Sequence, residues 1–168
     1  MLSSEVVRLI NEQINQEFYS AYLYLSFSNY YKEEGLDGFG NWYYIQAQEE
    51  RDHAIQFLNY LHDNGENVTL REIKAPDVVL DSYLAPLEAG LKHERLVTGL
   101  IHRIYDAAHL SKDYRTMQFL DWFVKEQGEE EKNAEDLVKK FQLFGSDPKS
   151  LYMMDQNLGA RTSAPSES

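Results

Sequence analysis

The stretch QAQEERDHAIQF, from Gln46 to Phe57, has the period of an amphipathic helix but carries an acid and an imidazole on its apolar face. At about 3.6 residues per turn, that face collects nine residues of the surrounding segment: Phe39, Trp42, Tyr43, Gln46, Glu50, His53, Phe57, Tyr60 and Leu61. Glu50 and His53 therefore point toward the predicted core, where an uncompensated charge is costly. The stretch predicts a long helix that buries ionisable groups for a reason other than packing.

Length and composition limit the class of protein. The chain has 168 residues, which suits one domain with a sizeable core. No apolar run approaches the roughly 18 residues that span a bilayer. The N-terminal sequence lacks the cationic and apolar regions of a signal peptide. We therefore expect no membrane association and a cytoplasmic location.

Charge and cysteine content narrow the choice of ligands. The chain has no cysteine, so any bound metal ion must use oxygen and nitrogen ligands. The formal net charge is −12, and no block of lysine and arginine exists to replace the counterions of a phosphate backbone. These features disfavour nucleic acid as a partner and favour cations.

Apolar residues recur at helical spacing between sparse glycines and prolines, which predicts an all-α fold. Four long helices are expected: about Glu5–Tyr31, a second one ending near His62, Pro86–Leu110 and Tyr114–Phe144. Short turns join the first helix to the second and the third to the fourth, which predicts two antiparallel hairpins. The long connection between the second and third helices suits a bundle in which one crossover returns the chain along its length, so these two helices should be parallel.

The C-terminal region predicts a short helix and a tail. Asp147-Pro148 has the pattern of a helix cap and first residue, and this fifth helix should reach about Leu158. The polar sequence GARTSAPSES predicts a disordered tail. The expected organisation is one domain over residues 1–158, followed by the tail over 159–168.

The segment FYSAYLYLSFSNYY, Phe18 to Tyr31, is apolar or aromatic around nearly its whole circumference. A single core cannot cover all of that surface. Because large exposed apolar patches usually mark contacts between proteins, we expect an extensive subunit interface here.

The other long helices also carry polar residues on their apolar stripes. The two hairpins share one register, because a constant spacing of 77 residues pairs Glu17 with Glu94, Glu50 with Gln127, and His53 with Glu130. Antiparallel hairpins related in this way bring six side chains to one level of the bundle: Glu17, Glu50, His53, Glu94, Gln127 and Glu130.

Four ionised carboxylates at one level of a core would suffer both desolvation and mutual repulsion. A multivalent cation removes both costs, whereas the alternative is that several carboxyls stay protonated with raised pKa values. Carboxylates with one imidazole favour iron or manganese, with zinc as a competitor, and we interpret the site as an iron site. Two ions fit, with Glu50 bridging them. Since the fourth helix offers Gln127 instead of an imidazole, the second position should be the weaker one.

Taken one at a time, several of these residues can be explained without a metal ion. His53 alone could be a core histidine with satisfied hydrogen bonds. Tyr24, one heptad beyond Glu17, could be plain core, or a phenol near the metal that donates an electron or a hydrogen bond. Glu126 and Glu129 follow one flank of the fourth helix with Glu130, and Glu49 lies at the edge of the Glu50 stripe; these acids form either a solvated charged face or a third cation position.

Four segments together resemble the prokaryotic non-haem ferritins: NEQINQEFYSAYLY around Glu17, AQEERDHA around Glu50 and His53, KHERL with Glu94, and FLDWFVKEQGEEEK with Gln127 and Glu130. The resemblance covers about Leu2 to Leu158. It implies a ferritin-like bundle that forms a hollow homo-oligomeric shell of 24 subunits. Such a shell oxidises ferrous iron with O₂ or H₂O₂ and stores the ferric product as a mineral.

The resemblance also implies roles for individual residues. Glu17, Glu50 and His53 match the ligands of the first ferroxidase iron, Glu94 and Glu130 match those of the second, and Gln127 matches the residue beside it. A third iron site is matched by Glu49, Glu126, Glu129 and Glu130, while Tyr24 and Trp122 match nearby aromatic residues. The haem-containing relatives place a methionine where this chain has Asp52, so we expect no haem.

Two rival classes remain open at this stage. One is a small di-iron oxidase or peroxidase that retains its metal ions. The other is a metal-free helical interaction protein.

Overall fold

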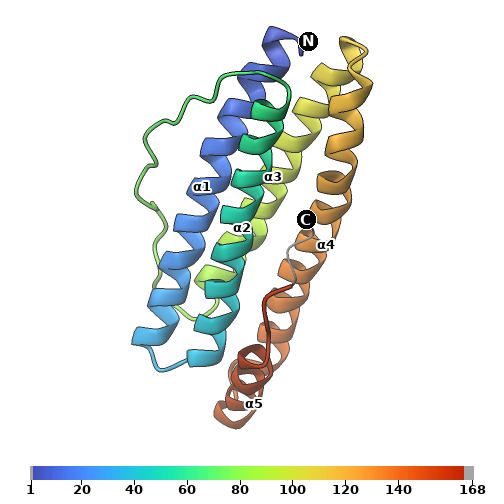
Figure 1. The fold of residues 1–168 in the computed structure, drawn as a ribbon. Coiled ribbons are helices and arrows are strands. Elements are labelled where there is room, and N and C mark those ends of the chain that lie inside the picture. Colours follow the sequence, from blue (N-terminus) through green and yellow to red (C-terminus); the bar gives the residue numbers. More distant parts are fainter. Residues whose placement is uncertain (1, 165–168) are drawn as a thin grey trace.

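The computed structural model describes residues 2–164, and all regular structure in this range is helical (Figure 1). The helices are α1 (Ser4–Glu33), α2 (Asp37–Asp63), α3 (Ala85–Leu110), α4 (Tyr114–Phe144) and α5 (Pro148–Gly159). The predicted all-α fold is confirmed, including the fifth helix, and the bounds of α4 agree with the expected ones.

Side chains cap most of these helices. Ser3 accepts a hydrogen bond from the Val6 amide at the start of α1, and Asp113 and Asp147 cap α4 and α5 in the same way. The start of α2 differs, because Leu36 provides no side-chain cap. Instead, Asp155 of α5 accepts a hydrogen bond of 3.0 Å from the Phe39 amide. A residue far along the chain therefore completes the start of α2.

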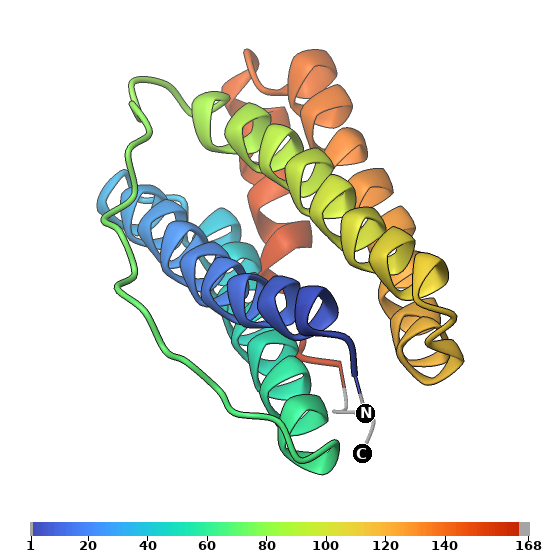
Figure 2. The same cartoon turned by 90° about the horizontal axis from the view of Figure 1, so that it is seen from above.

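The helices form two antiparallel hairpins, α1 with α2 and α3 with α4 (Figures 1 and 2). The segment 64–84 returns along the length of the bundle beside α1, so α2 and α3 run parallel, as expected (Figure 1). Asn11 of α1 fastens this crossover, because its side chain donates to the Asn67 carbonyl and accepts from the Thr69 amide. Helix α5 packs at the end of the bundle against α2 and α4.

The core consists of two apolar clusters with a polar level between them. In α1, one cluster uses residues 6–14 and the other uses residues 23–31, and Glu17 lies in the gap. In α4, Phe123 belongs to the first cluster and Leu137 to the second, with Gln127 and Glu130 between them. The bundle therefore positions the predicted site residues at one height.

Two further expectations concern the ends of the helices and the membrane. None of the described helices combines the length and apolarity that a bilayer crossing needs. The predicted tail begins inside α5 at Gly159, and Arg161 packs onto α2 through three hydrogen bonds. Residues 165–168 of the predicted tail lie outside the described residues.

Candidate metal centre

Three predicted ligands converge where α1 faces α2. Glu17, Glu50 and His53 each offer one ligand atom, and these atoms lie within 4.8 Å of one another. The side chains are almost completely buried, with 1%, 2% and 5% exposure. Glu50 and His53 share a face because they are separated by one helical turn, and His53 Nδ1 lies 3.1 Å from Glu50 Oε2. A carboxylate–carboxylate–imidazole set of this kind suits a divalent first-row cation.

One oxygen in this cluster has no partner. Glu17 Oε1 accepts a hydrogen bond of 2.7 Å from Gln13, whereas the buried Glu17 Oε2 accepts none from any described residue. Leaving a buried acceptor unsatisfied typically costs about 1–3 kcal/mol, and more for a charged group. The donor set and this oxygen both fit a cation held by Glu17, Glu50 and His53.

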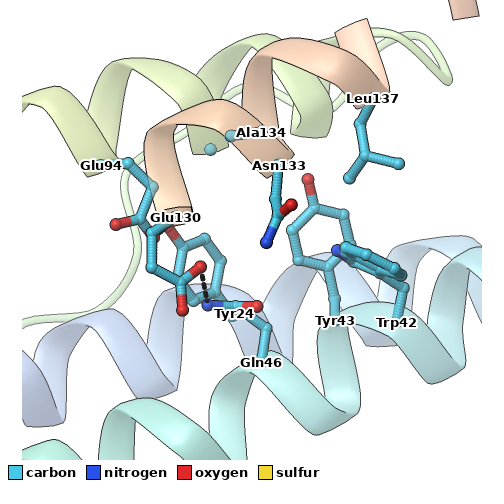
Figure 3. Close-up of a pocket in the computed structure, with 10 residues that line it drawn as sticks. Tyr24, Trp42, Tyr43, Gln46, Glu94, Glu130, Asn133, Ala134 and Leu137 are labelled. Atoms are coloured by element: carbon cyan, nitrogen blue, oxygen red, sulfur yellow. Dashed lines mark hydrogen bonds between the residues drawn. The ribbon is translucent and has the colours of Figure 1, made fainter. Parts of the chain in front are cut away.

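Glu94 and Glu130 lie on the facing hairpin and are held by neutral donors. The Tyr24 hydroxyl donates to Glu94 Oε1, and Gln127 donates to Glu94 Oε2 at 3.1 Å. Gln46 joins the halves of the site, because its amide nitrogen lies 2.8 Å from Glu130 Oε2 and 3.1 Å from Glu50 Oε1. Figure 3 shows Tyr24, Gln46, Glu94 and Glu130 around a cavity of about 20 Å³, which is large enough for one water molecule.

The two halves of the site therefore differ in how many ligand oxygens are free to bind a cation. Among the described residues, Glu94 and Glu130 do not join the compact cluster of Glu17, Glu50 and His53. A cation in the second half must compete with hydrogen bonds from Tyr24, Gln46 and Gln127. This difference gives a structural reason for the prediction of a weaker second position, which stays a prediction.

The electrostatics of the site follow from burial and from the proximity of like charges. Burial raises the pKa of Glu17 well above its ordinary value, and the charge of Glu50 raises it further. The same two causes raise the pKa of Glu94 to about 8. Burial and the charges of Glu94 and Glu50 raise the pKa of Glu130. In the metal-free chain, protons bound to these carboxyl groups therefore neutralise part of the negative charge that a cation would otherwise balance.

Glu50 and His53 shift in the directions of an ion pair. Burial raises the pKa of Glu50, but the charge of His53 and the hydrogen bonds to this carboxylate lower it by more. Burial lowers the pKa of His53, and the surrounding carboxylates outweigh that effect and raise it to about 10. A metal ion at Nδ1 or Nε2 would have to displace the proton of this imidazole.

A groove of about 660 Å³ runs between α2 and α4 beside His53. Glu49, Glu126 and Glu129 line it, together with Trp122, whose ring lies edge-on to His53 at 5.4 Å. Glu130, the fourth residue matched to a third iron site, lies in the buried polar level and does not line this groove. The groove thus brings these three glutamates, together with Asp52, to the flank of the buried cluster.

The structure adds three residues that the sequence did not single out. Gln13 supports Glu17 from one turn away, and this spacing was visible in the sequence. His93 is buried beside Glu94 and lies 2.7 Å from Ser20 Oγ. Arg161 reaches Gln46 and Glu49 from beyond α5, and no periodicity within α2 could reveal that contact.

A four-helix bundle with a buried level of carboxylates, an imidazole and a long crossover defines the ferritin-like class of helical proteins. Residues 7–144 match the model of the ferritin-like domain, and the chain belongs to the ferritin family. It is 42% identical to a bacterial non-heme ferritin of Campylobacter jejuni over 156 residues, which are 93% of each chain. It is 40% identical to one of Staphylococcus epidermidis over 162 residues, covering 96% of this chain and 98% of the relative.

A comparison with a solved structure also places the fold among the ferritins. The fold is similar to that of an open-pore ferritin from the hyperthermophilic archaeon Archaeoglobus fulgidus, with a TM-score of 0.93 and 42% identity. The match covers 96% of this chain and 98% of that one.

Proposed function

We propose that this chain is a subunit of an iron-storage ferritin that oxidises Fe(II) inside its helical bundle and deposits Fe(III) mineral within a shell of 24 subunits. Iron is both substrate and cargo in this proposal. The single observation that carries it is the buried cluster of Glu17, Glu50 and His53, in which Glu17 Oε2 has no hydrogen-bond partner among the described residues.

The ligand set supports oxidation of iron at this site. Carboxylate oxygens stabilise Fe(III) more strongly than Fe(II) because the added charge increases the attraction, so the site favours loss of an electron. Two ferrous ions supply two electrons, which with two protons reduce O₂ to H₂O₂, or H₂O₂ to water. In this mechanism, Glu17 and His53 hold the first ion, Glu50 bridges, and Glu94 and Glu130 hold the second.

Neighbouring residues have supporting roles in this proposal. Tyr24 donates a hydrogen bond to Glu94, so its phenol lies beside the second position. Gln127 keeps Glu94 in place through a second hydrogen bond. Glu49, Glu126 and Glu129 form a third cation position in the groove beside His53, through which ferric product leaves the bundle.

Assembly of the shell would use the apolar surface of α1. Tyr22, Leu25 and Tyr44 are 49%, 43% and 44% exposed, and they line one apolar groove on α1 and α2. We define the apolar groove by all of its lining residues: Phe18, Ala21, Tyr22, Leu25, Tyr44, Ala47, Gln48, Arg51 and Ile73. A second copy of the chain is the proposed occupant, as the sequence of α1 predicted.

The test is an iron-loading titration of the assembled protein in air. Fe(II) is added in increasing equivalents per subunit while ferric absorbance and particle size are followed, with protein-free buffer as the control. Storage predicts soluble ferric iron far above three ions per subunit in particles of constant size. Stable retention of only two ions would instead support an oxidase that keeps its metal, and no binding would support a scaffold; either result would contradict storage.

A further inference from the structure

Arg161, two residues beyond α5, reaches the candidate metal centre with its side chain. Its guanidinium donates to the Trp42 carbonyl at 3.1 Å, to Gln46 Oε1 at 2.9 Å and to Glu49 Oε2 at 2.7 Å. It also lies over the Trp42 ring, 4.2 Å from the centroid. Its side chain is only 16% exposed. Because residues 42, 46 and 49 occupy one face of α2, a single planar cation can bind all three.

The contact with Gln46 determines which way that amide points. A guanidinium can only donate hydrogen bonds, so the group facing Arg161 must be the amide oxygen. The amide nitrogen is then directed to Glu50 and Glu130, which accept at 3.1 Å and 2.8 Å. The reversed amide would place an oxygen against two carboxylates and an NH₂ group against a cation. Arg161 thus fixes the donor that links the halves of the site.

The contact with Glu49 affects the groove. Glu49 is one of four acidic residues that line it, with Asp52, Glu126 and Glu129, and its side chain is 22% exposed. Arg161 neutralises this carboxylate with a hydrogen-bonded ion pair of 2.7 Å. A cation that binds Glu49 must displace the guanidinium or share the oxygens with it. Ala164, three residues further along the chain, lines the same groove.

We propose that Arg161 is a positioning residue of the candidate metal centre, which holds Gln46 toward Glu50 and Glu130 and keeps Glu49 occupied until the buried positions are filled. The inference rests on the proposed iron-binding function and adds an order of filling. The buried cluster of Glu17, Glu50 and His53 takes the first cation, and the groove takes a cation last because Arg161 competes for Glu49.

The test uses Zn²⁺ alone as a redox-inert probe of the full-length assembled protein, measured by isothermal titration calorimetry. Removing one positive charge at contact distance changes the affinity of a neighbouring cation site by about tenfold or more. We expect Arg161→Gln to increase the Zn²⁺ affinity of the weakest position by about this factor. The difference in affinity between the strongest and weakest positions should therefore become smaller. Identical isotherms for Arg161→Gln and wild type would overturn the inference.

Three further variants separate positioning from a general structural effect. Arg115→Gln removes an exposed arginine that binds Asn64 at the far end of the bundle, and it should leave the isotherm unchanged. Arg161→Lys keeps the positive charge but loses the planar fork that contacts Trp42, Gln46 and Glu49, so its weakest Zn²⁺ position should bind with an affinity between those of wild type and Arg161→Gln. The double variant Arg161→Gln/Glu49→Gln should lose the increase in Zn²⁺ affinity that Arg161→Gln produces. A gain that persists without the Glu49 carboxylate would contradict the proposed competition.

The outcome also distinguishes this inference from the proposed function. A wild-type protein that binds no Zn²⁺ and oxidises no Fe(II) would overturn both. A wild-type protein that oxidises iron, combined with an Arg161→Gln variant whose Zn²⁺ affinities are unchanged, would overturn the role of Arg161 alone.

Discussion

At the residue scale, protons would compete with a bound cation for the same buried oxygens. Burial and repulsion raise the pKa values of Glu17, Glu94 and Glu130, so the metal-free site keeps protons that a cation must expel. Binding of Fe(II) should therefore release protons and weaken as the pH falls. Replacement of a proton by a cation should be most favourable at Glu17 Oε2, because this buried oxygen has no hydrogen-bond partner among the described residues.

The first prediction concerns the ligands of the buried cluster. Glu50→Ala and His53→Ala should slow the fast phase of Fe(II) oxidation at least tenfold, because even residues that merely support metal ligands are worth about 10–100-fold. Assembly should be unaffected, since both side chains lie inside one subunit. Stopped-flow absorbance measures the rate, and Glu88→Ala, an exposed glutamate of α3, serves as the control. Wild-type rates in either ligand variant would refute the assignment.

The second prediction is a pH dependence of the metal-free protein. From the ordinary glutamate pKa of 4.5 up to about 8, the folded chain holds a proton on Glu94 that the unfolded chain has lost. The free energy of unfolding should therefore fall as the pH rises through this window, by about 1.4 kcal/mol per pH unit for each retained proton. The raised pKa of His53 acts in the same direction above pH 6.5, and the lowered pKa of Glu50 acts only below pH 4.5.

Chemical denaturation after chelation, at pH 5.5 and pH 8, measures this effect. Glu94→Gln should reduce the slope, since it removes one of the titrating groups. Saturating Zn²⁺ should reverse the trend, because a cation that displaces protons binds more tightly at pH 8. Metal-free stability that rises between pH 5.5 and pH 8 would show that the carboxyls are ionised without a cation.

The sequence predicted those site residues that repeat with helical period, and it missed those held by distant contacts. Glu50 and His53 were visible because a polar pair interrupts an otherwise aromatic face. The constant spacing between hairpins then placed Glu94 and Glu130 at the same level. Arg161 gave no such signal, because its partners lie more than 110 residues earlier in the chain.

At the element scale, α5 completes α2. Asp155 caps the start of α2, and a side-chain carbon at Gly38 would lie 1.7 Å from the Asp155 carbonyl oxygen. Only glycine permits this approach. The caps of α4 and α5 were readable from Asp113 and Asp147, which lie next to the helices they cap. The cap of α2 was not, because it depends on how two distant elements pack.

The third prediction follows from that close contact. Gly38→Ala should undock α5 and lower the free energy of unfolding by more than the roughly 1–3 kcal/mol typical of overpacking, since the obstacle is rigid backbone. Hydrogen exchange should increase selectively in α5 and around Arg161. Gly99→Ala, at an exposed position of α3 with nothing within 4 Å, should be neutral or stabilise by up to about 1 kcal/mol. Equal protection of α5 in both variants would contradict the docking role of Gly38.

At the scale of the whole molecule, the fold separates chemistry from assembly. The polar level lies inside one bundle between two apolar clusters, whereas the apolar groove lies on the outer surface of α1 and α2. The circumference of α1 predicted an exposed apolar surface, and the exposure of Tyr22 and Leu25 agrees with it. Which copy covers the groove, and in what orientation, depends on a second chain that no helical period encodes.

The fourth prediction tests this separation. Leu25→Arg places a charge in the middle of the apolar groove, and desolvating an unpaired charge in an interface costs several kcal/mol. At micromolar concentration the variant should sediment as a much smaller species than wild type, with its helical content unchanged. Leu110→Arg is the matched control, because Leu110 is 83% exposed at the end of α3 and outside the groove. Since Glu17, Glu50 and His53 belong to a single subunit, the dissociated Leu25→Arg protein should still bind Zn²⁺ at its strongest position. A variant that loses tight Zn²⁺ binding as it dissociates would mean that assembly, and not the bundle alone, holds the metal centre together.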